Sequence, residues 1–113
     1  LAPDRRRAWD AGTGNGQAAR MLARHFDQIF ASDPSAGQLA HASSHPRVTY
    51  AVEPAEQCSL GDGSCDLVLA ATALHWFKHE QFFHEARRVL RPGGLLAAIG
   101  YDWFYVDPEV DSL

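Results

Sequence analysis

The sequence predicts an α/β fold in which helices cover a doubly wound, mostly parallel sheet. Short apolar runs alternate with amphipathic segments of helical period along the whole chain. Three alternating glycines, Gly12, Gly14 and Gly16, turn the first apolar run into the first amphipathic segment. Residues 66–71 are almost continuously apolar, which is typical of a strand buried on both faces of a parallel sheet. Together these observations favour a Rossmann-like arrangement.

The first unit, residues 7–26, predicts a strand, a glycine turn and a helix. Glycine accepts backbone angles that are closed to other residues, and its missing side chain lets a ligand approach the main chain. The N–H groups at the start of the following helix then face the turn. A nucleotide-like cofactor fits such a turn, and a glycine turn without a ligand is the alternative.

The remaining elements are bounded by proline, glycine or polar residues. We expect strands at 29–31, 48–52, 66–71 and 95–99, helices at 35–44 and 78–90, and room for a short helix at 55–60. The last helix turns an apolar stripe inward and a polar face outward: Phe82, Phe83, Ala86, Val89 and Leu90 inward, and His79, Glu80, Arg87 and Arg88 outward. Connections of this length require right-handed crossovers.

Composition excludes several classes of function. The 113 residues suffice for one domain, which we place at residues 1–113, with roughly two-thirds of its unfolded surface buried. The net charge of −4 provides no electrostatic footprint for nucleic acid, and residues 5–7 form a solvated basic lead-in to the first strand. No apolar run approaches 18 residues and no signal peptide is visible, so we expect a cytoplasmic protein without membrane contact.

Two further observations set expectations for the chain as a whole. Cys58 and Cys65 lack a CxxC spacing and a histidine partner, so we expect reduced thiols and no metal site. The chain begins at Leu1 instead of Met. We therefore expect a piece of a longer protein, truncated at both ends.

Asp33 stands at the carboxyl end of the second predicted strand, where open α/β sheets bind ligands. It lies 19 residues beyond Gly14, close to the offset of about 20 at which an acidic residue binds ribose hydroxyls. A carboxylate can accept from both the 2′- and the 3′-hydroxyl group. Asp33 could also cap the helix that starts after Pro34, and the two roles are compatible.

The glycine turn fits two motifs. Residues 14–19 satisfy the G-x-G-x-x-G/A pattern of dinucleotide-binding proteins. Asp10-x-Gly12-x-Gly14-x-Gly16 resembles the first motif of class I S-adenosylmethionine (SAM) methyltransferases.

Further motifs extend the second resemblance over about residues 8–101. They are Asp33-Pro34-Ser35, Ala55-Glu56, Asp66-Leu67-Val68 and Arg88-Val89-Leu90-Arg91-Pro92-Gly93-Gly94, in this order. The chain thus resembles a class I SAM-dependent methyltransferase with a type 11 methyltransferase domain. Residues 73–77 resemble the subgroup related to trans-aconitate methyltransferase.

This resemblance implies roles for individual residues toward SAM. Asp10 would orient the glycine turn and approach the amino group of the cofactor, and Gly12, Gly14 and Gly16 would line its methionine and ribose parts. Asp33 would hold the ribose hydroxyls.

The same resemblance implies contacts at the two ends of the cofactor. Pro34 would lie beside the adenine, and Ala55 and Glu56 would edge its ring, with a backbone N–H toward a ring nitrogen. Ala71 and Thr72 would face the methionine end.

The resemblance also implies an activity, the transfer of a methyl group from SAM to a small-molecule acceptor. SAM carries its own leaving group, so the protein must mainly position the acceptor. His75 is the candidate base, with packing or substrate orientation as the alternative role. Two other functions remain open: a nicotinamide-dinucleotide domain of an oxidoreductase, and a non-catalytic SAM-binding fragment. The dinucleotide alternative leaves Ala55-Glu56, His75-Trp76 and residues 91–94 unexplained.

The related enzymes usually have seven strands, and this chain predicts five. Nothing supplies the usual hairpin beside residues 95–99, and Asp107-Pro108-Glu109 has the form of a helix start. Residues 95–99 would then be an apolar edge without proline, lysine or an inward charge. Such an edge should recruit a second copy to form a homodimer, or else the chain is part of a longer protein that covers it.

Overall fold

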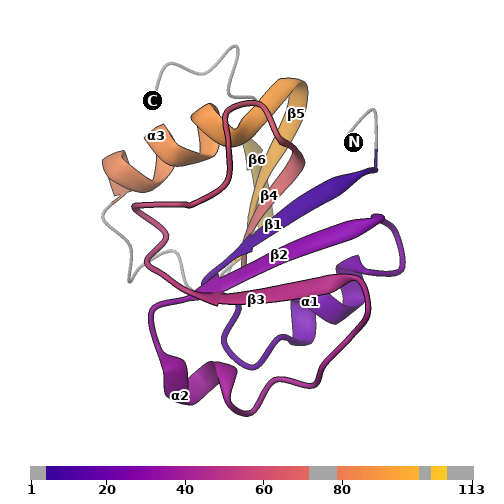
Figure 1. The fold of residues 1–113 in the computed structure, drawn as a ribbon. Coiled ribbons are helices and arrows are strands. Elements are labelled where there is room, and N and C mark those ends of the chain that lie inside the picture. The colour runs from indigo at the N-terminus through magenta and orange to yellow at the C-terminus, as the bar shows by residue number, and fades with distance from the viewer. Residues whose placement is uncertain (1–4, 72–78, 100–102, 107–113) are drawn as a thin grey trace.

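A six-stranded sheet with helices on both faces forms the frame of the molecule (Figure 1). The computed structural model describes residues 5–71, 79–99 and 103–106. The strands are β1 (Arg7–Ala11), β2 (Gln28–Asp33), β3 (Val48–Val52), β4 (Cys65–Ala71), β5 (Leu90–Ile99) and β6 (Trp103–Val106). The helices are α1 (Gln17–Leu22), α2 (Ala36–Leu39) and α3 (His79–Val89). The predicted α/β class is confirmed.

The strand order is β3-β2-β1-β4-β5-β6, and the first five strands are parallel. β1 therefore lies inside the sheet, where Trp9 is paired with Phe30 of β2 and with Val68 of β4. The chain leaves β1 toward β2 and β3 and later returns on the other side of β1 with β4. Open α/β sheets bind ligands outside the carboxyl ends of the strands at such a reversal of strand order.

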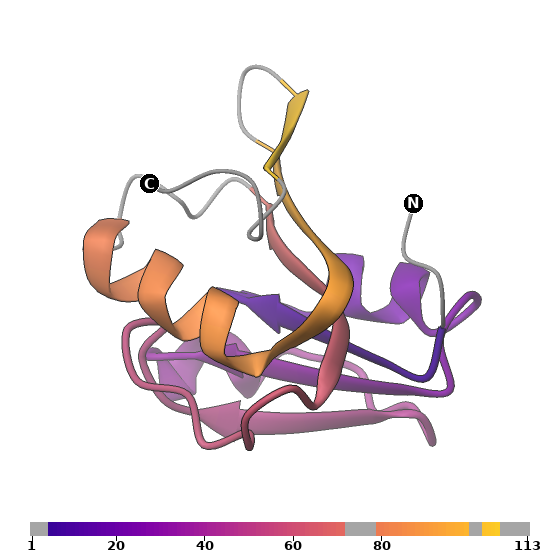
Figure 2. The same ribbon diagram turned by 90° about the horizontal axis from the view of Figure 1, so that it is seen from above.

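Successive side chains of β1 point to opposite faces of the sheet, so they contribute to two separate core clusters. Trp9 and Ala11 belong to the cluster beneath α3, whereas Ala8 belongs to the cluster beneath α1. The Trp9 ring is fully buried and lies 5.8 Å from the ring of Phe82, centroid to centroid. Figure 2 shows α3 on one side of the sheet and α1 on the other.

One helix is shorter than the sequence predicts, and another does not form. α2 covers only Ala36–Leu39 of the expected range 35–44, and none of its residues is buried. A short helix without a buried face gains little from packing, so it does not extend. Residues 55–60 form turns instead of the short helix for which there was room.

β5 begins at Leu90, before the expected strand 95–99. Its register against β4 shifts between the Cys65 and Leu67 pairings. Within this irregular stretch a Cβ at Gly94 would lie 3.0 Å from the carbonyl oxygen of Asp66, so a side chain there would be tightly crowded. α3 ends at Val89, and residues 91–94 form an irregular stretch of a longer strand instead of a turn before it.

The expectation of an open edge at residues 95–99 is wrong. β6 pairs antiparallel with β5, from Leu96 opposite Val106 to Ile99 opposite Trp103. The apolar edge of β5 is therefore occupied by the same chain, and the predicted homodimer loses its basis. The missed signal is the run of aromatic and β-branched residues at 103–106.

Candidate cofactor-binding site

The glycine turn connects the carboxyl end of β1 to α1. Gly12, Gly14 and Gly16 have φ angles of 71°, 60° and 84°, in the left-handed region that favours glycine. Backbone bonds fix the turn, because the Thr13 N–H donates to the Ser32 carbonyl at 2.8 Å and the Gly16 N–H donates to the Thr13 carbonyl at 3.0 Å. The turn is thus attached to the end of β2.

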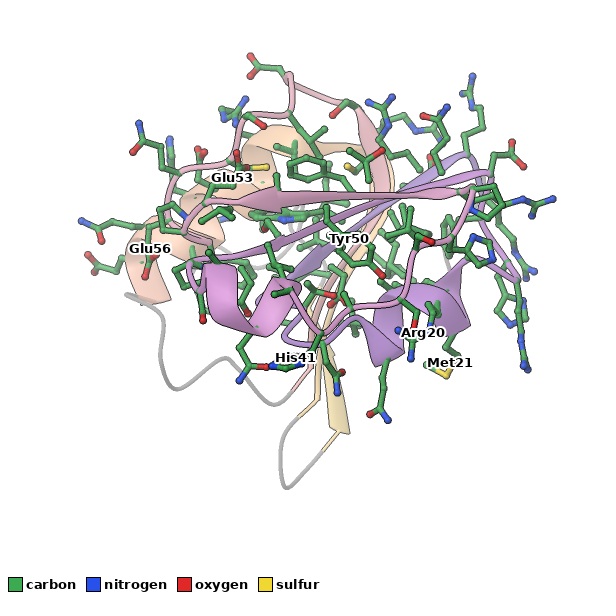
Figure 3. The ribbon with its side chains drawn as sticks, turned by 60° about the horizontal axis from the view of Figure 1, so that its bottom comes forward. Arg20, Met21, His41, Tyr50, Glu53 and Glu56 are labelled. Carbon is green, nitrogen blue, oxygen red and sulfur yellow. The ribbon has the colours of Figure 1, made fainter. Side chains whose placement is uncertain are left out.

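Gly14 and Gly16 differ in what surrounds them. Among the described residues, a Cβ on Gly14 would meet only the Gln38 side chain, at 3.8 Å, which is an ordinary contact distance. A Cβ on Gly16 would lie 2.6 Å from the Tyr50 hydroxyl. Tyr50 projects from β3 (Figure 3), and its hydroxyl donates to the Ser43 carbonyl at 2.9 Å. Gly14 can therefore admit a ligand, whereas the Cβ direction of Gly16 is filled by this chain.

Asp33 at the end of β2 links the glycine turn to the start of α2. Its Oδ2 accepts the Gly14 N–H at 2.9 Å, and its Oδ1 accepts the Ser35 N–H at 2.8 Å. The cap of α2 is Ser35, whose Oγ accepts the Gln38 N–H at 3.2 Å. A carboxylate offers about four acceptor positions. After these two bonds, Asp33 retains acceptors that fit a pair of ribose hydroxyls.

Asp10 is a buried carboxylate at the base of the same turn. Only 1% of Asp10 is exposed, and its Oδ2 accepts the Thr13 hydroxyl at 2.6 Å. Its Oδ1 has no hydrogen-bond partner within the described part of the chain. Burial raises the pKa of Asp10 to about 7; the Thr13 bond opposes this shift, and the charge of Asp33 adds to it. An unsatisfied buried acceptor beside the turn fits the amino group that a SAM molecule carries.

The predicted adenine edge lies on the segment between β3 and β4. Ala55 is 2% exposed and packs in the cluster that contains Trp9, while Glu56 is partly exposed. The Glu53 N–H donates to the carbonyl of Asp33 at 3.1 Å, so this segment starts beside the ribose candidate. Glu53 and Glu56 follow β3 in Figure 3.

The structure therefore brings most of the predicted site residues to one end of the sheet. The glycine turn, Asp10 and Asp33 are directly bonded to one another or to shared neighbours, and Pro34 is exposed beside them. Ala71 ends β4, where it is paired with Ile99. Thr72 and His75 lie outside the described residues.

Sequence reasoning missed several contacts in and around the candidate site. Thr13 holds Asp10, and the amide of Gln38 approaches Gly14. Arg88, expected to face outward, instead bonds to the segment before β4. The sequence does not indicate these contacts, because each depends on a partner that only the fold brings near.

An open cavity of about 530 Å³ lies at the opposite end of the strands, with Arg7, Asp66 and Arg91 in its lining. Asp66 accepts the backbone N–H groups of Arg6 and Arg7 at 2.8 and 3.1 Å and pairs with Arg91. This cavity is distinct from the candidate site. Among the described residues, no helix is long and apolar enough to cross a membrane.

Comparison with known proteins supports the resemblance to methyltransferases. Residues 9–98 match the family model described as a methyltransferase domain. A Dictyostelium discoideum protein described as a methyltransferase is 39% identical over 93% of this chain, which covers 40% of that protein. The methyltransferase ptaI of Pestalotiopsis fici is 36% identical over 83% of this chain, which covers 32% of it. The chain thus spans less than half the length of these relatives.

Solved structures agree in fold. A structure described as a type II methyltransferase from Anaeromyxobacter dehalogenans has a TM-score of 0.86 and 49% identity, and the match covers 99% of this chain and 48% of that one. A structure from Anabaena variabilis, described as a methyltransferase from an antibiotic biosynthesis pathway, has a TM-score of 0.76 and 31% identity over 85% of this chain and 40% of that one. The trans-aconitate subgroup stays a prediction. The chain belongs to the type 11 methyltransferase domain family, within the class I SAM-dependent methyltransferases.

Proposed function

We propose that the protein containing this chain transfers a methyl group from SAM to a small-molecule acceptor. The observation that carries the proposal is the arrangement around Asp33. Its carboxylate is bonded to the Gly14 N–H and retains free acceptor positions, and a side chain on Gly14 would meet no described residue except Gln38. A ribose diol is the group that such a carboxylate binds at the carboxyl end of a second parallel strand.

When bound, SAM supplies an electrophilic methyl group together with its leaving group. The contribution of the chain is to hold and orient. Asp33 accepts the ribose hydroxyls, and the main chain of the turn at Gly12 and Gly14 lines the ribose and methionine parts. Asp10 offers its unsatisfied Oδ1 toward the amino group, and a positive charge there favours the ionised carboxylate.

The other predicted residues complete this arrangement. Pro34, Ala55 and Glu56 would edge the adenine, and the family resemblance assigns Ala71 and Thr72 to the methionine end. His75 follows β4 in the sequence, so it would stand near the transferred methyl group as a base or as a group that orients the acceptor.

Two observations favour a small acceptor. The net charge of −4 does not suit nucleic acid, and the Anabaena relative is described as part of an antibiotic biosynthesis pathway. The two cysteines are buried free thiols, which suits a reducing compartment such as the cytoplasm.

Calorimetric titration with S-adenosylhomocysteine and, in parallel, with NAD tests the proposal. We expect S-adenosylhomocysteine to bind with one-to-one stoichiometry and NAD to give no heat of binding. Binding of NAD alone would support the dinucleotide alternative and overturn the proposal. A protein that binds S-adenosylhomocysteine but transfers no methyl group to any acceptor would be the non-catalytic alternative.

A further inference from the structure

The loop between β3 and β4, residues 53–64, contains neither a helix nor a strand. Backbone N–H and C=O groups that are removed from water need hydrogen-bond partners, which regular structure normally provides. In this loop several of the partners come instead from side chains. Two of these side chains, Glu85 and Arg88, belong to α3 and are here named the α3 clamp.

Glu85 holds the middle of the loop. It is 9% exposed, and its Oε1 accepts the Cys58 N–H at 2.8 Å. The two Glu85 oxygens also accept bonds from Arg88, at 2.9 Å from Nε and at 3.1 Å from Nη2. The hydrogen bond from Arg88 lowers the pKa of Glu85, so the carboxylate stays ionised at neutral pH.

Arg88 holds the end of the loop. Nη1 donates to the Leu60 carbonyl at 2.8 Å and to the Asp62 carboxylate at 2.9 Å, and Nη2 donates to the Cys58 carbonyl at 2.8 Å. With the two bonds to Glu85, Arg88 makes five hydrogen bonds, which is the full number of N–H donors of a guanidinium group. The Arg88 carbonyl also accepts the Gly63 N–H at 2.8 Å.

The start of the loop is fixed independently. The Glu53 N–H donates to the Asp33 carbonyl at 3.1 Å, and Glu53 Oε1 accepts the Ser59 N–H at 2.9 Å. Ala55 and Cys58 are both buried in the core cluster that includes Phe82 of α3. Ala55 and Glu56 therefore lie on a short segment with one end attached to Asp33 and the other attached to the clamp.

We propose that the α3 clamp is a positioning device for base recognition: Glu85 and Arg88 hold the 53–64 loop so that its backbone reads the adenine of the cofactor. The inference rests on the proposed function. In this proposal Glu85 and Arg88 influence adenine recognition only by holding the 53–64 loop. The edge of adenine carries an acceptor nitrogen beside an amino group, whereas hypoxanthine carries a protonated nitrogen beside a carbonyl. A fixed backbone edge distinguishes the two bases, and a loosened edge distinguishes them less well.

Arg88→Lys is the main test variant, because lysine keeps the positive charge but has three donors on one nitrogen and cannot span Glu85, Cys58 and Leu60. Glu85→Gln is the milder second variant, which keeps the side-chain shape if Arg88→Lys does not fold. Arg24→Lys is the matched control, since Arg24 is exposed and follows α1, the helix on the other side of the sheet from α3.

Each protein is titrated with S-adenosylhomocysteine and with its hypoxanthine analogue, S-inosylhomocysteine, and its melting temperature is recorded. We expect the parent to prefer the adenine compound. We expect Arg88→Lys to reduce this preference by about tenfold, the size of one hydrogen bond, and Glu85→Gln to reduce it in the same direction. Arg24→Lys should keep the parental preference.

The ratio of the two affinities separates positioning from a structural role. A variant that melts earlier but keeps the parental ratio would show that the clamp only stabilises the fold, and this result would overturn the inference alone. A parent that binds neither compound would overturn the proposed function, and with it the inference. Loss of preference in a folded clamp variant, with the control unchanged, supports the clamp.

Discussion

The two sides of the candidate site are built in different ways. On the glycine-turn side, main-chain groups and glycine angles form the surface, and Asp33 is bonded directly to the Gly14 N–H. On the side of the 53–64 loop, side chains from α3 hold a segment that lacks regular structure. A substitution that adds a side chain blocks a surface made of main-chain groups. A surface held in place by side chains is disrupted when their hydrogen-bond donors or charges are removed. Affinity for S-adenosylhomocysteine and the free energy of unfolding both report on this difference.

The largest expected effect is at Gly14. Gly14→Val should abolish measurable binding, because a branched side chain would occupy the proposed ligand space at the turn. The positive φ of 60° adds strain of about 1–2 kcal/mol for a residue with a side chain. Gly14→Asn separates the two causes, since asparagine tolerates the angle better but still fills the space. Normal binding by a folded valine variant would place the ligand elsewhere.

Asp33→Ala should weaken binding by about 10- to 150-fold, because hydrogen bonds to a charged acceptor contribute roughly 1.5–3 kcal/mol. Asp33→Asn should weaken it less, since one acceptor oxygen remains. Ser35→Ala is the control: it removes the cap of α2 and costs about 1 kcal/mol of stability, without touching the carboxylate. If Asp33→Ala and Ser35→Ala bind equally well, Asp33 serves only the local fold.

Asp10 should make stability depend on pH in an unusual direction. Its folded pKa of about 7 lies above the ordinary value of 3.8, so between these values the folded state keeps a proton that the unfolded state has lost. The contribution of Asp10 to stability is therefore present below pH 4 and is lost as pH rises toward 7, by up to about 1.4 kcal/mol per pH unit.

Denaturant titrations of the parent and Asp10→Asn at several pH values measure this contribution as a difference. We expect the difference to shrink when S-adenosylhomocysteine is present, because its amino cation favours the ionised carboxylate. Parallel stability curves for the two proteins, with and without ligand, would contradict the assignment.

The smallest effect on affinity is expected at Gly16. Gly16→Ala should change binding by less than about twofold while it lowers stability by roughly 1–3 kcal/mol, because the added Cβ meets Tyr50 at a positive φ. Gly16→Ala combined with Tyr50→Phe removes the nearest atom and should recover part of the stability. A strong loss of affinity in a folded Gly16→Ala variant would mean that Gly16 also faces the ligand.

The same contrast explains what the sequence could predict. Alternation defines β3, which was expected at 48–52 and is found at Val48–Val52. The glycine turn and Asp33 are visible because their function needs particular residue types at short spacing. The structure places them at one end of the sheet, and their roles toward SAM stay predictions.

The rest of the site could not be predicted, because its contacts join distant segments. Cys58 and Glu85 are 27 residues apart, and Cys58 and Arg88 are 30 residues apart, without a local pattern that pairs them. Helical period alone placed Arg88 on the outer face, whereas a long guanidinium side chain can reach around a helix to a neighbouring loop. β6 was missed because the proline that follows it favoured a helix start.

The interior position of β1 also bears on the order in which a nascent chain can fold. Ala8, on one face of β1, packs with α1 and β2, which leave the ribosome soon after it. Trp9, on the other face, packs against Phe82 of α3. At about 5–20 residues per second, synthesis of the segment between β2 and α3 takes roughly 2–9 s. For that interval the Trp9 face is an apolar surface that a chaperone can bind, and docking of α3 ends its exposure.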